Sequence, residues 1–168
     1  GDALIGLPSN GLHTNGYSLA RKLFGQDAAA LNKRYPELDE TVGEALLKPH
    51  RCYYTVLKPC LSYIKGLAHI TGGGLTENLP RVLPEGCGAR IDLTAWKLPP
   101  VFRWLAEAGG LAQSEMLKTF NAGIGMVVVA KAKHAGHIAD LLTGEGEKVY
   151  RLGTVTDRPG MDYIGTLS

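Results

Sequence analysis

The sequence predicts an α/β or α+β domain with a mixed β-sheet and helices on its faces. Short apolar runs typical of strands alternate along the chain with stretches whose apolar residues recur at helical spacing. The chain has 168 residues, of which 45% are hydrophobic, and a chain of this size buries about 68–70% of its unfolded surface. No internal repeat or low-complexity tract interrupts it. We therefore expect a single domain over residues 1–168.

The first part of the chain contains two strand-like runs separated by helical stretches. Each run is short, apolar and ended by proline or glycine, while the helical stretches carry apolar residues three and four positions apart. In order, we expect a strand at 3–7 ended by Pro8, a helix at 16–24 closed by Gly25, a polar surface excursion with short helical pieces at 26–43, a short helix ended by Pro49, a helix at 54–65 and a strand at 66–71.

The second part of the chain continues this alternation. We expect a helical stretch at 75–83 interrupted by Pro80, a strand at 87–93, a helix at 101–109, a helix at 113–120 that Ser114 could cap, an interior strand at 124–132 and a helix at 134–142. The turn signal DRPG then separates residues 148–156 from 161–167, which predicts a terminal β-hairpin.

The charge balance and the apolar runs exclude several classes of protein. Lys plus Arg number 18 and Asp plus Glu number 16, so the net charge is +2, and no basic run favours binding to nucleic acid. No apolar stretch reaches the roughly 18 residues of a membrane span, and no signal peptide is visible. We therefore expect a cytoplasmic protein with neither a membrane nor a nucleic acid as partner.

The three cysteines favour reduced thiols. Cys52, Cys60 and Cys87 are odd in number and form no C-x-x-C pair. Neither a disulfide framework nor a zinc ribbon fits this pattern.

Two glycine-rich loops share one design. The strand ending in ALIGL leads into PSNGLHTNG, and the strand LAHIT leads into GGGLTEN, each before an expected helix. Such loops expose backbone N–H groups that suit an anion, and glycine lets the backbone approach it closely. Neither loop is a Walker A or Rossmann fingerprint, and each alone could be a turn packed against neighbouring backbone. Together they favour a phosphorylated small molecule.

Several side chains near these loops are candidates for chemistry. His13 lies inside the first loop, where a role in proton transfer or phosphate binding is favoured. His69 lies in an apolar strand, where a hydrogen-bonded core histidine is the stronger alternative. Glu77 and Asn78 could contact Mg²⁺ or cap a helix, and these alternatives stay equal. The remaining histidines, at positions 50, 134 and 137, are expected at the surface.

Four blocks, in this order, resemble one family. The chain is similar to the C-terminal half of phosphoribosylformylglycinamidine cyclo-ligases, the AIR synthetases of purine biosynthesis. The blocks that carry the similarity are GLPSNGLHTNGYSLARK, LLKPHRCY, HITGGGLTENLPRVLP and TFNAGIGMV. The resemblance runs from the first residue to the terminal strands, and the HITGGG block separates this family from its ATP-binding relatives. It implies a three-layer α/β/α domain of α+β class with a mixed sheet, AIR synthetase C-terminal-domain-like and distantly ferredoxin-like.

The resemblance also implies a reaction. In this family the formamide oxygen of formylglycinamidine ribonucleotide is phosphorylated with ATP and Mg²⁺, a nitrogen attacks that carbon, and phosphate leaves as aminoimidazole ribonucleotide forms. The enzyme is a homodimer when full length. By position, the resemblance makes His13 and His69 catalytic candidates. The expected substrate- and phosphate-binding residues are Ser9, Asn10, Gly11, Thr14, Asn15, Gly16, Thr71, Gly72, Gly73, Gly74 and Asn78, with Glu77 the one weak metal candidate. Asn121 is expected to hold a loop by hydrogen bonds rather than to bind a ligand.

The chain departs from the family in one large respect. The N-terminal half that carries the nucleotide and the metal in this family has no counterpart here, so we expect the chain to be half an enzyme and inactive alone. The chain begins without Met on an abrupt strand, which fits either a piece of a longer protein or removal of a tag. Two rivals remain: a domain of a related ATP-dependent kinase or synthetase, and a non-catalytic structural domain.

Overall fold

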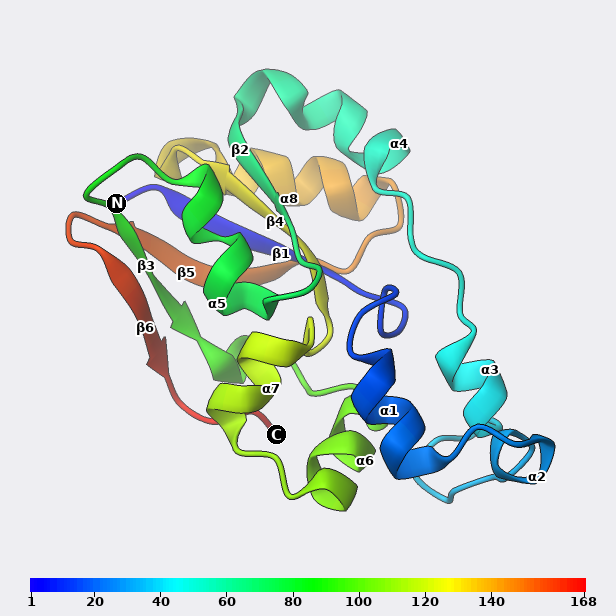
Figure 1. The fold of residues 1–168 in the computed structure, drawn as a ribbon. Helices are drawn as coiled ribbons and strands as arrows, with labels where there is room; N and C mark the ends of the chain where they lie inside the picture. The colour runs from blue at the N-terminus through cyan, green and yellow to red at the C-terminus, as the bar shows by residue number, and fades with distance from the viewer.

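A computed structural model describes residues 1–168, whose strands form one six-stranded mixed sheet in the order β2-β4-β1-β5-β3-β6 (Figure 1). The strands are β1 (Ala3–Pro8), β2 (Ile64–His69), β3 (Gly88–Asp92), β4 (Ile124–Ala130), β5 (Tyr150–Thr156) and β6 (Gly160–Ile164). The helices are α1 (Tyr17–Phe24), α2 (Ala28–Leu31), α3 (Val42–Leu46), α4 (Tyr54–Leu57), α5 (Gly74–Asn78), α6 (Pro100–Gly109), α7 (Gln113–Thr119) and α8 (Ala135–Gly144). Short 3-10 helices cover Lys58–Tyr63, Pro80–Val82, Leu93–Ala95 and Ala132–His134.

Helices cover both faces of the sheet, which confirms the expected three-layer arrangement. All seven residues of β4 are buried, and their side chains alternate between two apolar clusters, Val127 and Val129 in one and Val128 and Ala130 in the other. The larger cluster holds 29 buried residues beneath α1, α3, α5, α6 and α7, and the smaller holds 10 beneath α4, its following 3-10 helix and α8. In Figure 1 α4 and α8 accordingly lie on one side of the sheet and α1, α6 and α7 on the other.

Four of the strands reproduce a ferredoxin-like pattern. β2, β4, β1 and β5 are neighbours in that order, and each adjacent pair is antiparallel. Helices connect β1 to β2 and β4 to β5, as in a βαββαβ unit. β3 and β6 then extend the sheet beyond β5.

The expected terminal hairpin is wrong, because β5 and β6 do not pair with each other. β3 lies between them, antiparallel to β5 and parallel to β6. The chain between β5 and β6 therefore passes over the start of β3. Gly88 permits this crossing, since a Cβ there would lie 2.2 Å from the carbonyl oxygen of Gly160 and 2.5 Å from that of Arg158. DRPG does turn the chain between β5 and β6, but the turn does not determine which strand β6 pairs with.

Two helix expectations also need correction. The helix predicted at 54–65 remains α-helical only to Leu57, because Pro59 has no N–H to continue the ladder, and Ile64 already pairs with Ala130 in the sheet. Ser114 does not cap α7: the helix begins at Gln113 after Ala112, with no side-chain cap.

No helix in the structure is both long enough and apolar enough to cross a membrane.

The two glycine-rich loops emerge at one edge of the sheet. Leu7, near the end of β1, and His69, at the end of β2, both pair with Met126 near the start of β4. The ends of β1 and β2 and the start of β4 therefore lie together, and the segments that adjoin them form the candidate site.

Candidate functional site

The two glycine-rich loops contact each other. We call residues 9–16 loop A and residues 71–74 loop B. A Cβ on Gly72 would lie 3.0 Å from Oδ1 of Asn15, so the Asn15 side chain of loop A rests against the backbone of loop B. The structure thus brings together the two sets of residues that the sequence singled out separately.

A third segment, residues 117–123, packs against both loops. The ring of Phe120 occupies the space where a Cβ on Gly16 would fall, 2.1 Å from its Cε1. The carbonyl oxygens of Leu117 and Phe120 lie 2.1 and 2.6 Å from the Cβ position of Gly74. Gly74 is required because the backbone atoms beside it cannot move aside, and Gly16 because the Phe120 ring fills the space and its own backbone has φ of 74°.

Asn121 ties loop A to this segment, as expected. Its Nδ2 donates to the carbonyl of Gly11 at 2.8 Å, and its Oδ1 accepts from Oγ of Ser9 at 2.7 Å and from the N–H of Gly123 at 2.8 Å. The side chain is 1% exposed. Its polar atoms are thus occupied in holding the loop, which confirms the prediction made from TFNAG.

The loops leave backbone donors free. No hydrogen bond within the chain uses the N–H groups of residues 11–14 in loop A or of 71–73 in loop B. Thr14 and Gly72 are exposed, and His13 and Thr14 have left-handed backbone angles, with φ of 52° and 63°. Successive N–H groups in such conformations form concave anion-binding surfaces. The geometry therefore suits a phosphate or another anion at the junction of the loops.

His13 is buried and held in one tautomer. Nδ2 of Asn10 donates to the carbonyl of Pro49 at 2.8 Å, which turns Oδ1 of Asn10 toward His13 Nε2 at 2.6 Å. The backbone N–H of Asn10 also faces Nε2, at the longer distance of 3.3 Å. Because Oδ1 of Asn10 only accepts and is the closer partner, we place the proton of His13 on Nε2, which leaves Nδ1 buried without a partner. The ring is 1% exposed, so His13 meets no solvent directly.

His50 and His69 complete a cluster with His13 that the sequence did not predict. His50 stacks on His13 with ring centroids 4.2 Å apart, and its Nε2 lies 2.7 Å from Nε2 of His69. His69 is exposed at the end of β2, so the core-histidine alternative is wrong for it. His134 and His137 instead pack on Tyr63 beside α8, outside the cluster. The only local signal was the block KPHR, in which His50 follows a helix-ending proline.

Burial lowers the pKa of His13 to about 4, with smaller effects from the charges of His50, His69 and Arg51, and burial also lowers the pKa of His69. An unfolded histidine titrates near pH 6.5. Between about pH 6.5 and 4 the unfolded chain therefore binds a proton that folded His13 does not. The free energy of unfolding should fall as the pH falls through this window, by at most about 1.4 kcal/mol per pH unit for His13.

Urea unfolding at several pH values across this window, on the wild type and on His13→Asn, checks the prediction. Asparagine tolerates the left-handed backbone of this position and does not titrate. We expect a shallower pH dependence in the variant, and equal slopes would contradict the assignment to His13.

The segment after His50 anchors the base of loop A. The carbonyl of Pro8 accepts from the Tyr53 hydroxyl at 2.7 Å and from Nη1 of Arg51 at 3.3 Å. Nη2 of Arg51 also pairs with the buried Glu147. Burial is the main cause of a raised pKa at Tyr53, so its hydroxyl stays protonated and remains a donor. Gly125 makes room for it, since a Cβ there would lie 2.0 Å from the Tyr53 hydroxyl oxygen and 2.8 Å from Cε1 of His13.

Glu77 and Asn78 do not cap the start of α5, whose N-cap is Gly73 without a side-chain hydrogen bond. Nδ2 of Asn78 donates to the carbonyls of Gly72 and Gly74 at 3.0 and 2.8 Å, so Asn78 holds the shape of loop B. Glu77 is half-exposed and lies 3.9 Å from Arg81. Contacts of either residue with substrate or Mg²⁺ stay predictions.

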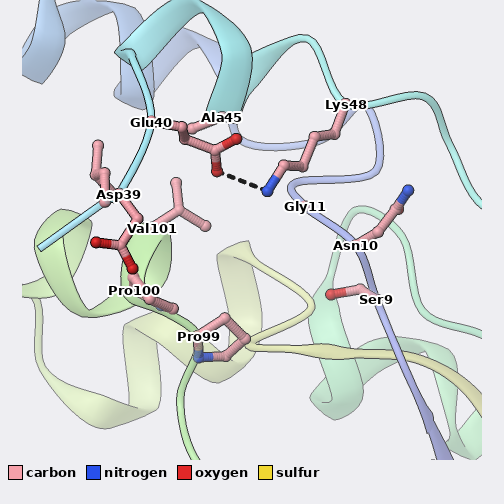
Figure 2. A pocket seen from close by; sticks show the side chains of 11 residues that line it. Ser9, Asn10, Gly11, Asp39, Glu40, Ala45, Lys48, Pro99, Pro100 and Val101 are labelled. Carbon is pink, nitrogen blue, oxygen red and sulfur yellow. Dashed lines mark hydrogen bonds and ion pairs between the residues drawn. The ribbon is translucent and has the colours of Figure 1, made fainter. Parts of the chain in front are cut away.

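A pocket of about 450 Å³ opens on the other flank of loop A (Figure 2). Its polar lining comes from Ser9, Asn10, Asp39, Glu40 and Lys48, and Nζ of Lys48 pairs with Glu40 at 2.6 Å. In Figure 2 Ser9 and Asn10 form one wall and Asp39 lies opposite. Ser9 and Asn10 were expected as binding residues, whereas Asp39 and Glu40 lie in residues 26–46, which carry no recognisable motif, and were not predicted.

Comparison with known proteins identifies the family to which the sequence is similar. A model of the family "AIR synthase related protein, C-terminal domain" matches residues 1–165. Phosphoribosylformylglycinamidine cyclo-ligases of Neisseria meningitidis and Desulfitobacterium hafniense are each 48% identical to this chain, over 97% and 98% of it and over 48% and 49% of their own lengths. The chain thus spans about half the length of the curated relatives it matches.

Two solved structures share the fold. Thiamine-monophosphate kinase from Stenotrophomonas maltophilia has a TM-score of 0.67 at 17% identity, and the Escherichia coli hydrogenase maturation protein HypE has a TM-score of 0.66 at 22% identity. Each alignment covers 100% of this chain and 51% or 49% of the other. At these identities the likeness concerns the fold alone.

Proposed function

The chain belongs to the family of AIR synthase related C-terminal domains, and from that membership we propose that it supplies one half of the active site of a phosphoribosylformylglycinamidine cyclo-ligase. The reaction would be ATP-dependent closure of formylglycinamidine ribonucleotide to aminoimidazole ribonucleotide. The other half would be an N-terminal domain that holds most of the contacts to ATP and Mg²⁺, and the whole enzyme would be a homodimer.

One observation carries the proposal: loops A and B meet, and both contain backbone N–H groups that have no acceptor within the chain. The substrate carries a phosphate, and hydrogen bonds from several N–H groups to a charged acceptor are worth about 1.5–3 kcal/mol each. Asn121, Phe120 and Asn78 fix these donors in place before a ligand arrives. Such preorganisation favours charge that develops during phosphoryl transfer.

His13 and His69, the two catalytic candidates, differ in whether a substrate can reach their side chains. His69 is exposed at the loop junction and is the histidine that can meet substrate. His13 is buried, and its bond to Asn10 positions that side chain on the wall of the pocket beside loop A. We therefore assign proton transfer to His69 and positioning to His13. A kinase or synthetase of the same fold is a weaker candidate, because those neighbours share 17–22% identity against 48% for the cyclo-ligases.

The test is formation of aminoimidazole ribonucleotide by this chain mixed with a separately expressed N-terminal half from a family member, with each half alone as control. We expect product from the mixture only. Turnover by this chain alone would overturn the half-site proposal, and no turnover by a mixture shown to be assembled would overturn the reaction.

The same mixture tests the assignment of His69. We expect His69→Asn to lower kcat by about 10²–10⁴-fold, the usual contribution of positioned acid–base catalysis. The double variant His134→Ala/His137→Ala removes two histidines outside the loop junction and should keep wild-type kcat. Equal rates in all three proteins would exclude proton transfer by His69.

A further inference from the structure

Three histidines from separate segments converge at the junction of the loops. His13 comes from loop A, His50 from the segment after α3 and His69 from the end of β2. One ring nitrogen of each lies within 4.8 Å of the other two, and the closest pair, Nε2 of His50 and Nε2 of His69, is 2.7 Å apart. Zn–N bonds of about 2.0–2.1 Å place two ligands of a tetrahedral ion about 3.4 Å apart. The observed spacings bracket that value. Because the rings of His13 and His50 are stacked, 4.2 Å apart and 23° from parallel, the half-exposed His50 ring must rotate to direct a nitrogen at the ion.

The surroundings of His13 match those of a metal ligand. Ligating histidines usually donate the other ring N–H to an oxygen that fixes the tautomer and the ring orientation. Nε2 of His13 donates to Asn10, which Pro49 fixes in turn, while Nδ1 keeps its lone pair, is buried and has no partner. A buried nitrogen acceptor with no partner is unfavourable in a folded protein unless a ligand fills that role.

The other two histidines are available as ligands. Each of His50 and His69 makes its one side-chain hydrogen bond to the other, so no protein group outside the cluster competes for these rings. The nearby guanidinium of Arg51 is paired with Glu147, which reduces its repulsion of a cation.

We propose that His13, His50 and His69 bind a divalent transition metal of the Zn²⁺ class through three imidazole nitrogens. Three neutral nitrogen ligands suit Zn²⁺, Co²⁺, Ni²⁺ or Cu²⁺ rather than Mg²⁺, which prefers oxygen. The three segments leave the fourth position to water or to an anion held by the loops. The site is therefore distinct from any Mg²⁺ that accompanies a nucleotide. It does not depend on the proposed cyclo-ligase reaction, because His69 serves as a ligand when the ion is bound and is free to transfer a proton only when the ion is absent.

The test is titration of the purified chain with Co²⁺, followed by visible absorption, and then displacement by Zn²⁺ measured by calorimetry. We expect one ion per chain with the d–d bands of a four-coordinate site. His50→Ala and His69→Ala should each weaken Zn²⁺ binding at least tenfold, as loss of a ligand does. Both side chains lie at or near the surface, so these variants should fold, and circular dichroism confirms it.

Two controls make the result specific. The double variant His134→Ala/His137→Ala removes the other histidine pair and should bind Zn²⁺ like the wild type. Cys52 is exposed and is the cysteine nearest to His50 in the sequence, and Cys52→Ser should leave the Co²⁺ spectrum unchanged. No Co²⁺ spectrum, or affinity that survives loss of His50 and of His69, would overturn the site. Equal loss in the His134/His137 control would show binding at scattered surface histidines and would overturn it as well.

Discussion

Replacing Asn121 with alanine is expected to lower the free energy of unfolding by about 2–5 kcal/mol. The substitution leaves the carbonyl of Gly11 and the N–H of Gly123 without the partners that Asn121 supplies at 2.8 Å. Both bonds are buried, and each stranded polar group costs about 1–3 kcal/mol. Ser9 also loses its acceptor at 2.7 Å. Urea or thermal unfolding, compared with the wild type, measures the loss.

Asn32→Ala is the matched control for this prediction. Nδ2 of Asn32 also donates to a backbone carbonyl, that of Ala28 at 2.8 Å, but the bond is exposed and water can replace it. We expect this variant to change stability by about 0.5 kcal/mol or less. If both variants lost the same stability, Asn121 would not be the anchor of loop A.

Replacing Gly74 with alanine is expected to cost a similar amount, about 2–5 kcal/mol, by a different mechanism. The new Cβ would lie 2.1 Å from the carbonyl oxygen of Leu117 and 2.6 Å from that of Phe120, so loop B and α7 must separate. The backbone of Gly74 also has φ of 57°, which costs a residue with a Cβ about 1–2 kcal/mol. Unfolding measurements give the total effect.

Gly110→Ala isolates the steric part of this loss. Gly110 has the same φ of 57°, yet no atom lies within 4 Å of its Cβ position. It should therefore lose only the backbone contribution, about 1–2 kcal/mol. An equal loss at both positions would show that the contact between loop B and α7 is not tight.

Most elements of the fold could be predicted from local patterns, but the pairing of the last strands could not. The apolar runs located β1, β2 and β4, of which β4 is wholly buried, β1 is largely buried and β2 has only Ala68 buried. β6 was placed beside β5 because DRPG predicts a tight reversal, whereas β3 lies between them. Strand order depends on contacts between distant segments, and nothing in the local sequence indicates that the missing Cβ of Gly88 permits the crossing.

In the candidate site too, some features could be predicted from the local sequence and others could not. Glycines, together with a histidine and an asparagine in or near each loop, marked loops A and B as a binding surface, because their backbone chemistry is local. The burial of His13 and the exposure of His69 were not predicted, since each depends on what packs over the residue in the folded chain. His50 lies next to His13 only through the path of residues 47–53, which no sequence pattern reveals.

The position of β1 within the sheet affects folding during synthesis as well as the stability of the folded chain. Of the six strands described, β1 is synthesised before the other five, yet its neighbours are β4 and β5, so Ala3 pairs with Ala130 and Thr154. At synthesis rates of about 5–20 residues per second, this apolar strand waits for several seconds with an unpaired backbone. Sheets that depend on such distant pairings fold slowly. The nascent chain is therefore exposed to aggregation or to chaperone binding until its last third has emerged.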